Sequence, residues 1–359
     1  MTDAILHKNV SSLALGQRVE ETEVYPYGFK LVEAIPANQL AVLLLGGSGA
    51  LTERATNGYL SSLQKWLQGS DIKDKVALYG AIYDMRVCAH YRHICDSAVA
   101  RRLLFQQHHH AVKVEKYDED SLNPAYVEDL FNQAFLHRIS DEQGQRLSVK
   151  EACARMRKLT VFAHCHGAYV FLKLEEKMQQ KMRQFGYVAT EREKILREMV
   201  CVAHAPHAPL GVSKAVMISF ASAKDGSINH YNHFVRELWR LSPDKVLMSY
   251  FPERRGELVL APGLGDVKDQ HTFAGLTPDN PDLDKYGRYL FRLERATLLH
   301  ALCRSAMQRP QTAQELICGS DADLKAEMEI LKSNGDAMWN TLRDNARKHC
   351  RERRQNTRV

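Results

Sequence analysis

The feature that most constrains the fold is a series of short apolar runs separated by segments with helical spacing. The runs, each of strand length, are Ala41–Leu45, Val76–Tyr83, Leu159–Ala163, Met199–Ala203, Ala215–Ala221 and Leu258–Ala261. Asn57–Leu67 and Ala168–Met182 lie between runs, and their apolar residues recur at helical spacing. Strands that alternate with helices predict an α/β protein, with a mostly parallel sheet and helices on both faces.

Further elements follow from the same patterns. Short strands are expected at Glu20–Val24 and Gly28–Val32, and helices at Pro124–Ile139, Ser148–Lys158 and Asn232–Leu241. Ser148 and Glu151 form a capping-box pattern. The pattern is helical from Tyr286 on, with a break near Pro310. We therefore predict an α/β domain over residues 1–310, with 85–147 as a candidate lid or insertion, and a C-terminal helical extension over 311–359.

Composition narrows the class of protein. A chain of 359 residues that is 45% hydrophobic and 26% charged is typical of globular proteins. No run approaches the roughly 20 apolar residues that span a bilayer, and Met1–Gly16 lacks the pattern of a cleaved signal. We expect a cytoplasmic protein, with secretion by a signal-independent route as the open alternative. The eight cysteines form no CxxC pairs, which favours reduced thiols over a disulfide framework.

The net charge of +6 is concentrated near the C-terminus. Residues 347–358 hold six arginines and lysines against one acid. Such a basic tail can contact an acidic partner, although a solvated helix end is the simpler interpretation. The charge is too small and too local to predict a nucleic-acid partner, and nothing in the sequence indicates an oligomeric state.

The strongest functional motif lies between the third apolar run and the helix after it. Ala163-His164-Cys165-His166-Gly167 has the form small–x–nucleophile–x–small. A nucleophile on so sharp a turn points out of the sheet, and the turn needs small residues two positions to either side. The amino end of the next helix faces the thiol and favours the thiolate. The motif predicts Cys165 as a nucleophile, with an ordinary buried cysteine as the alternative.

In this motif the chain resembles the α/β-hydrolase superfamily, many members of which carry a Gly-His-Ser-x-Gly-Gly elbow. Here Cys165 replaces the serine, similar to the dienelactone hydrolases, and Ala163 and Ala168 replace two glycines. The resemblance covers roughly residues 40–275. It implies a nucleophile, an acid and a histidine in that chain order, each after a strand.

The resemblance assigns the other two roles to residues downstream of Cys165. Asp225 follows the run Ala215–Ala221 and would be the acid, and His271 would be the base that it orients. Asp266 and Asp269, on the same loop as His271, are the alternative acids.

A glycine-rich turn follows the first apolar run. Gly46, Gly47 and Ser48 are expected to aim backbone amides at a substrate oxygen, together with the amide of His166, and so to form an oxyanion hole. The turn lacks the Gly-Lys-Ser/Thr ending of a phosphate loop, which argues against nucleotide binding. A plain strand–helix turn is the alternative.

Other histidines and cysteines are weaker candidates. The cluster Cys88, His90, His93 and Cys95 cannot easily turn four ligands onto one tetrahedral ion from a single helix, and His108–His110 and the pair His230 and His233 are expected to be polar surface or pocket residues. We therefore expect no metal and no cofactor. His204 and His207 follow a strand end and are candidates for lining the site.

These patterns predict a hydrolase or acyl transferase with a small-molecule or acyl substrate. A thiolate of Cys165 would attack an ester, thioester or amide carbonyl and form an acyl-enzyme intermediate. Two alternatives stay open: a non-catalytic binding module on the same fold, and a cysteine-dependent effector or toxin that modifies another cell's proteins.

Overall fold

Eight strands form one sheet. The computed structural model describes residues 5–8, 34–47, 53–82, 124–208, 212–225, 248–250, 256–307 and 309–333, with 337, 340 and 344. Its strands are β1 (Ile5–Lys8), β2 (Ala41–Leu45), β3 (Ala77–Ile82), β4 (Leu159–His164), β5 (Val200–His204), β6 (Val216–Ser222), β7 (Met248–Tyr250) and β8 (Gly256–Ala261). They follow the order β1-β3-β2-β4-β5-β6-β8-β7. The six central strands in this order, β3, β2, β4, β5, β6 and β8, are parallel to one another. The edge strands β1 and β7 are antiparallel to their neighbours.

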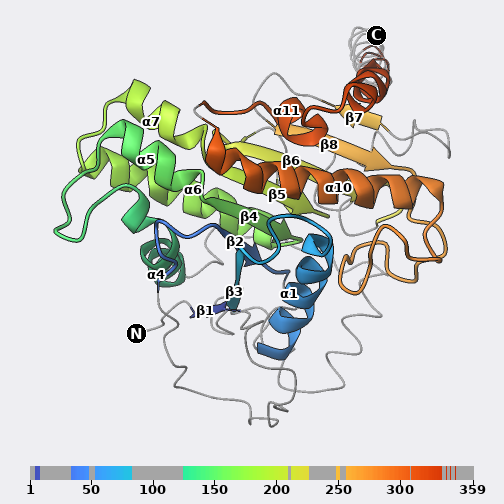
Figure 1. Cartoon of the computed structure of the whole chain (residues 1–359), viewed down its shortest axis with the longest axis horizontal. Helices are drawn as coiled ribbons and strands as arrows, with labels where there is room; N and C mark the ends of the chain where they lie inside the picture. The colour runs from blue at the N-terminus through green and yellow to red at the C-terminus, as the bar shows by residue number, and fades with distance from the viewer. Residues whose placement is uncertain are drawn as a thin grey trace, which may run out of the picture.

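Helices connect most of the parallel strands (Figure 1). They are α1 (Glu53–Leu67), α4 (Pro124–Ala134), α5 (Val149–Met156), α6 (Gly167–Gln184), α7 (Ala189–Leu196), α10 (Lys285–Cys303) and α11 (Ala313–Cys318), with 3-10 turns η3 (Leu136–Arg138) and η4 (Arg304–Ala306). Ser148 caps α5 by accepting a hydrogen bond from the amide of Glu151, as its pattern predicts. The strands expected at 20–24 and 28–32 and the helix expected at 232–241 lie outside the described residues.

The helix expected over Pro124–Ile139 is shorter than predicted. It ends at Ala134 and continues as the separate turn η3. The buried guanidinium of Arg138 donates hydrogen bonds to the carbonyls of Ala134 and Arg155, which gives the end of α4 a partner outside the helix.

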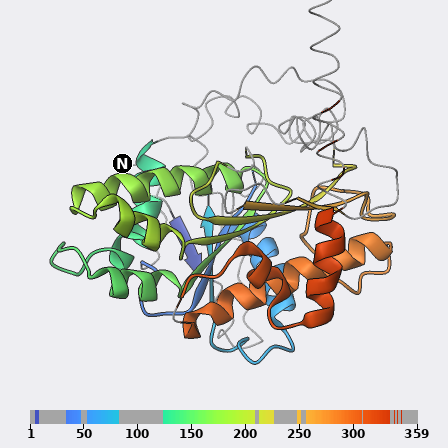
Figure 2. The ribbon, with the colours of Figure 1, turned by 90° about the horizontal axis from the view of Figure 1, so that it is seen from above.

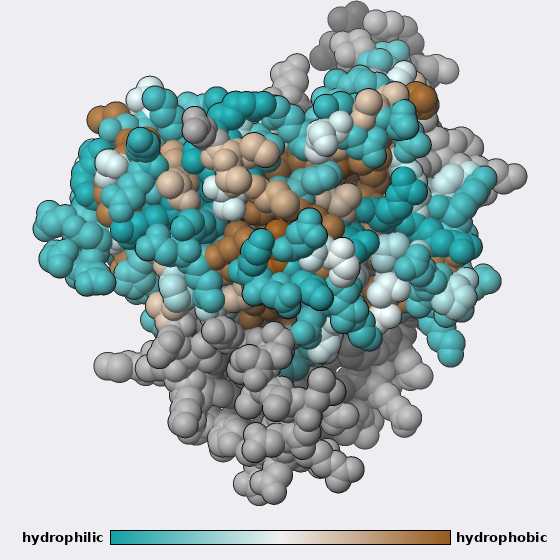
Figure 3. All heavy atoms as spheres, viewed as in Figure 1, coloured by the Kyte–Doolittle hydropathy of each residue, from teal (hydrophilic) through white to brown (hydrophobic). Residues whose placement is uncertain are grey.

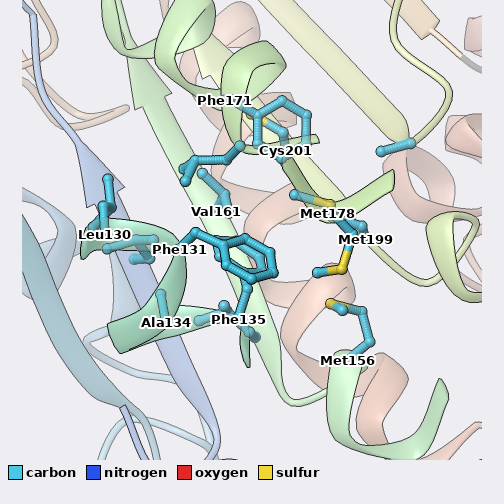
Figure 4. Close-up of a cluster of buried hydrophobic side chains, with 14 of the residues drawn as sticks. Leu130, Phe131, Ala134, Phe135, Met156, Val161, Phe171, Met178, Met199 and Cys201 are labelled. Carbon is cyan, nitrogen blue, oxygen red and sulfur yellow. The ribbon is translucent and has the colours of Figure 1, made fainter. Parts of the chain in front are cut away.

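Side chains that alternate along the strands build two hydrophobic clusters, one on each face of the sheet. Val161 and Ala163 of β4 join the cluster under α4, α5, α6 and α7, part of which is drawn in Figure 4. Phe162, between them, joins the cluster under α1, α10 and α11. Helix α10 crosses in front of the sheet in Figure 1, and Figure 2 shows the sheet between its helical layers. The predicted α/β fold, with helices on both faces, is confirmed.

The predicted insertion and the predicted C-terminal extension both contribute to these clusters. Tyr126 and Phe131 of α4 are fully buried over the sheet. Residues 124–134 of the predicted insertion therefore form a core layer, and residues 83–123, where a lid would remain, lie outside the described part of the chain. Ile317 of α11 and Met328, in the helical residues 322–333, are buried in the cluster around α10. The C-terminal helices thus share the core of the second face.

One face of the molecule is mainly polar. The face shown in Figure 3 is covered mainly by hydrophilic side chains, with hydrophobic ones gathered toward its middle. Among the described residues, no helix has the length and apolar character required to cross a bilayer.

The parallel strands end at one edge of the sheet. Leu45 at the end of β2 pairs with Ala163, His164 at the end of β4 pairs with His204, and Ser222 at the end of β6 pairs with Ala261. The loops that follow these strands therefore emerge side by side, as is usual for sites in such sheets.

Candidate active site

Cys165 occupies a sharp turn between β4 and α6. Its φ of 54° is in the left-handed region, which is uncommon for any residue but glycine. Its amide donates to the carbonyl of His204 at 3.1 Å, and Gly167 begins α6 two residues later. A Cβ on Gly167 would lie 2.0 Å from the carbonyl oxygen of Leu45. The small residue that the motif predicts is therefore required by the close approach of β2.

Two histidines lie beside the sulfur. The Nδ1 atom of His207 is 3.3 Å from Sγ of Cys165, and its Nε2 atom is 3.8 Å away. A ring nitrogen of His271 completes a group in which the sulfur and one nitrogen of each ring all lie within 4.8 Å of one another. The rings of His207 and His271 are tilted with centroids 4.9 Å apart. The structure thus brings Cys165 and His271 together, and adds His207.

Asp225 holds the far side of the His271 ring. Its Oδ2 atom is 2.6 Å from Nδ1 of His271, and the carboxylate is almost completely buried. Nε2 is therefore the nitrogen left for the sulfur. Burial disfavours the imidazolium, but the charge of a Cys165 thiolate and the bond to Asp225 outweigh it and raise the pKa of His271 well above 6.5.

The alternative acids take other positions. Asp269 is exposed and accepts a hydrogen bond from the backbone amide of His271, two residues on. Asp266 is exposed as well, and its amide bonds the carbonyl of Asp282. The carboxylate at the His271 ring is that of Asp225.

The loop that carries His271 is fixed at both sides of the histidine. Phe273 is fully buried, with its ring 4.9 Å from that of Phe162 in β4. Gln270 accepts hydrogen bonds from the Ser222 hydroxyl and the Leu264 amide, which ties the loop to the end of β6. Because Asp225 follows β6, the same bonds hold the loop of Asp225 next to the loop of His271.

The other histidines of the elbow are buried beneath the turn. His164 donates from Nε2 to the carbonyl of His271 at 2.9 Å. Burial, followed by the nearby charges of His271 and His204, lowers the pKa of His164 well below 6.5, so this ring is neutral and can donate only from the protonated nitrogen. Burial also lowers the pKa of His166 to about 4.

His204 differs from its expected place. It is 1% exposed, and its Nδ1 atom lies 2.9 Å from Oε2 of the buried Glu294 in α10. It does not line the site, because β5 directs its last side chain into the cluster under α10. His207, three residues after the end of β5, does lie beside the sulfur.

The turn after β2 approaches the elbow closely. Gly46 and Gly47 are buried, and a Cβ on Gly47 would lie 2.9 Å from Cβ of Cys165. The absence of a side chain therefore lets this backbone reach the nucleophile, which is what an oxyanion turn requires. Ser48, the third predicted member, lies outside the described residues.

Tyr59 is a neighbour of the site that sequence reasoning treated only as a helix residue. Its ring packs 5.2 Å from those of His164 and Phe273. Burial, with the charges of Cys165 and Asp269, raises the pKa of its hydroxyl. No sequence signal separates Tyr59 from the other apolar residues of α1.

The clusters of histidines and cysteines at 88–95, 108–110 and 230–233 lie outside the described residues.

No known family model matches the chain, and no curated protein matches it significantly. The fold class therefore rests on the sheet and its helices. The function must be argued from the arrangement of the site residues.

Proposed function

We propose that this protein is a cysteine hydrolase or acyl transferase in which Cys165 is the nucleophile, His271 the general base and Asp225 the residue that orients it. One observation carries the proposal: a thiol on a left-handed turn shares a cluster within 4.8 Å with an imidazole, and that imidazole is bonded to a buried carboxylate at 2.6 Å. Nucleophile, base and orienting acid in contact are the parts that acyl transfer needs.

The chemistry follows from these positions. His271 takes the proton of the Cys165 thiol, and the thiolate attacks the carbonyl carbon. The resulting tetrahedral intermediate collapses, the bond to the leaving group breaks, and the imidazolium of His271 returns its proton to that group. The acyl group is then a thioester on Cys165. Water, activated by the same imidazole, releases it as an acid; another acceptor in place of water would make the reaction a transfer.

The developing oxyanion needs backbone donors. The amide after the nucleophile, that of His166, and an amide of the turn after β2 are the donors that an elbow of this kind employs. The closeness of Gly47 to Cys165 supports that second donor.

We assign the orienting role to Asp225 because its carboxylate bonds the ring of His271.

The resemblance of the elbow to that of the α/β hydrolases agrees with this proposal. The acid after β6 and the histidine after β8 occur in the chain order of that superfamily. We therefore propose membership of the superfamily together with the activity. The rival hypothesis of a binding module predicts a cysteine that has no unusual reactivity.

Alkylation of the reduced full-length chain by iodoacetamide at neutral pH, resolved by peptide mass spectrometry, tests the nucleophile. Cys165 is 5% exposed, whereas Cys303 is exposed. Burial and the charge of Asp71 raise the pKa of Cys303, which makes it a matched unactivated thiol. We expect Cys165 to react faster than Cys303 despite its burial, and His271→Ala to remove most of that advantage.

Turnover of a panel of esters, thioesters and amides tests the reaction. Cys165→Ala is expected to abolish any turnover, and Cys303→Ala to leave it unchanged. If Cys165 reacts no faster than Cys303 and no substrate depends on it, the acyl-transfer proposal is refuted and the binding-module hypothesis takes its place.

A further inference from the structure

The proposed acyl chemistry leaves His207 without a role, although its ring lies beside the sulfur. Its Nδ1 atom is 3.3 Å from Sγ of Cys165, and its own amide donates to the carbonyl of Cys165 at 2.9 Å. The backbone of His207 is therefore bound to the elbow itself. A thiol with one histidine suffices for acyl transfer, so a second imidazole at the same sulfur needs its own explanation.

The three side chains have the composition of a zinc site. Thiolate and imidazole are the preferred protein ligands of Zn²⁺. Around a tetrahedral zinc ion, sulfur and nitrogen ligands are about 3.6 Å apart and two nitrogens about 3.4 Å apart, as follows from the usual bond lengths. The ligand atoms of Cys165, His207 and His271 all lie within 4.8 Å of one another, with the sulfur and Nδ1 of His207 at 3.3 Å.

The surroundings of His271 also fit a metal ligand. A histidine that binds zinc usually donates its other ring N–H to a carboxylate, which fixes the ring and increases its basicity. Asp225 has that position, at 2.6 Å from Nδ1 of His271. Both rings are partly exposed, so an ion can reach the cluster from solvent.

We propose that Cys165, His207 and His271 form a zinc-binding site with Asp225 as the partner of one ligand. Binding replaces the thiol proton of Cys165, and any second proton on His271, with bonds from sulfur and nitrogen to the ion, and the protons pass to solvent. Three protein ligands leave a fourth position for water. Since the ion takes the electron pair of the thiolate, zinc-bound and acylating states of Cys165 exclude each other. The inference depends on the cluster geometry and not on the proposed acyl chemistry.

Isothermal titration of Zn²⁺ into the reduced, chelator-treated full-length protein tests the site, with Co²⁺ absorption as a report of thiolate ligation. We expect one ion per chain and a thiolate-to-cobalt charge-transfer band. Cys165→Ser, His207→Ala and His271→Ala should each weaken zinc binding by more than about 100-fold, because loss of a second-shell partner alone typically costs 10–100-fold. Asp225→Asn should fall within that smaller range. His137→Ala and Cys303→Ser, which change an exposed histidine and an exposed thiol elsewhere, should bind as wild type.

Failure of this inference can be separated from failure of the acyl-transfer proposal. If wild type binds no stoichiometric zinc, or if His207→Ala binds as tightly as wild type, the zinc site is refuted, whatever the reactivity of Cys165. As a second measurement, one equivalent of Zn²⁺ should slow the alkylation of Cys165 in wild type more than in His207→Ala. Equal protection in both proteins would also overturn the role of His207.

Discussion

Gly167 of the elbow is tightly enclosed by backbone, and its replacement by alanine tests the geometry directly. A Cβ there would lie 2.0 Å from the carbonyl oxygen of Leu45, 2.6 Å from its carbon and 2.8 Å from the carbonyl oxygen of Gly46. All three are backbone atoms, so no side-chain rotation can relieve the contact. The start of α6 and the turn after β2 must separate instead.

The size of the effect can be worked from these distances. Real Cβ atoms essentially never approach closer than 3.0 Å, so the contact with Leu45 requires a shift of about 1 Å between the two backbones. Overpacking of this kind costs about 1–3 kcal/mol of unfolding free energy. A displacement of about 1 Å in catalytic geometry can lower turnover by about 100-fold. We therefore expect Gly167→Ala to fold with reduced stability and to lose about two orders of magnitude in Cys165 reactivity or turnover.

Urea unfolding and the alkylation rate of Cys165 measure the two effects separately. The matched control is Gly58→Ala in α1, where an added Cβ meets nothing within 4 Å. Gly58 is exposed in a helix, so alanine there should raise the unfolding free energy by about 0.5–1 kcal/mol and leave the thiol unchanged. Wild-type stability and reactivity in Gly167→Ala would refute the described approach of β2 to the elbow.

Asp225→Asn removes the charge that holds the His271 imidazolium, and should lower turnover by about 10²–10⁴-fold with unchanged circular dichroism; an undiminished rate would place the acid elsewhere. Arg304→Met strips the partner from the buried carbonyls of Ala301, Leu159 and Glu198 and should lower the urea-derived unfolding free energy by about 1–3 kcal/mol, whereas an unchanged free energy would contradict the role of the guanidinium. The hydrogen bond from Arg309 lowers the pKa of Glu315 to about 2, so its stabilisation is present above pH 4.5 and is lost as pH falls toward 2. Because the pair is largely solvated, Arg309→Ala should lower the unfolding free energy only slightly at pH 7 and not at all near pH 2, and an equal loss at both pH values would count against the ion pair.

The sheet could be predicted because its central strands are continuous apolar runs. Every residue of β2, β4, β5 and β6 is buried, which is the burial expected of strands covered on both faces. Helix α7 gave no comparable signal, since Ile195 and Leu196 are its only fully buried residues and no apolar stripe results. The edge strand β7 has three residues, which is too short for a pattern.

The elbow could be predicted for a related reason: its determinants are adjacent in sequence. The neighbours of Cys165 that make the turn are at most two positions away. The approach of His207 could not be predicted in the same way. It depends on Ala205, whose φ is 48°, and on the amide of His207 reaching the carbonyl of Cys165 on another loop. Likewise, the pairing of His204 with Glu294 joins β5 to α10, 90 residues away, and no local pattern reports it.

The central claim is that Cys165 forms an acyl enzyme, and rapid-quench mass spectrometry tests it most directly. The chain would be mixed with an activated acyl ester, quenched in acid and digested to locate the added mass. The account predicts one acyl group per chain, on Cys165, formed in a burst in wild type and strongly slowed in His271→Ala. Cys153 and Cys201 should stay unmodified at neutral pH, since burial raises the pKa of Cys153 to about 11 and that of Cys201 well above 9. An acyl group distributed over several thiols, or formed equally fast in His271→Ala, would contradict the account.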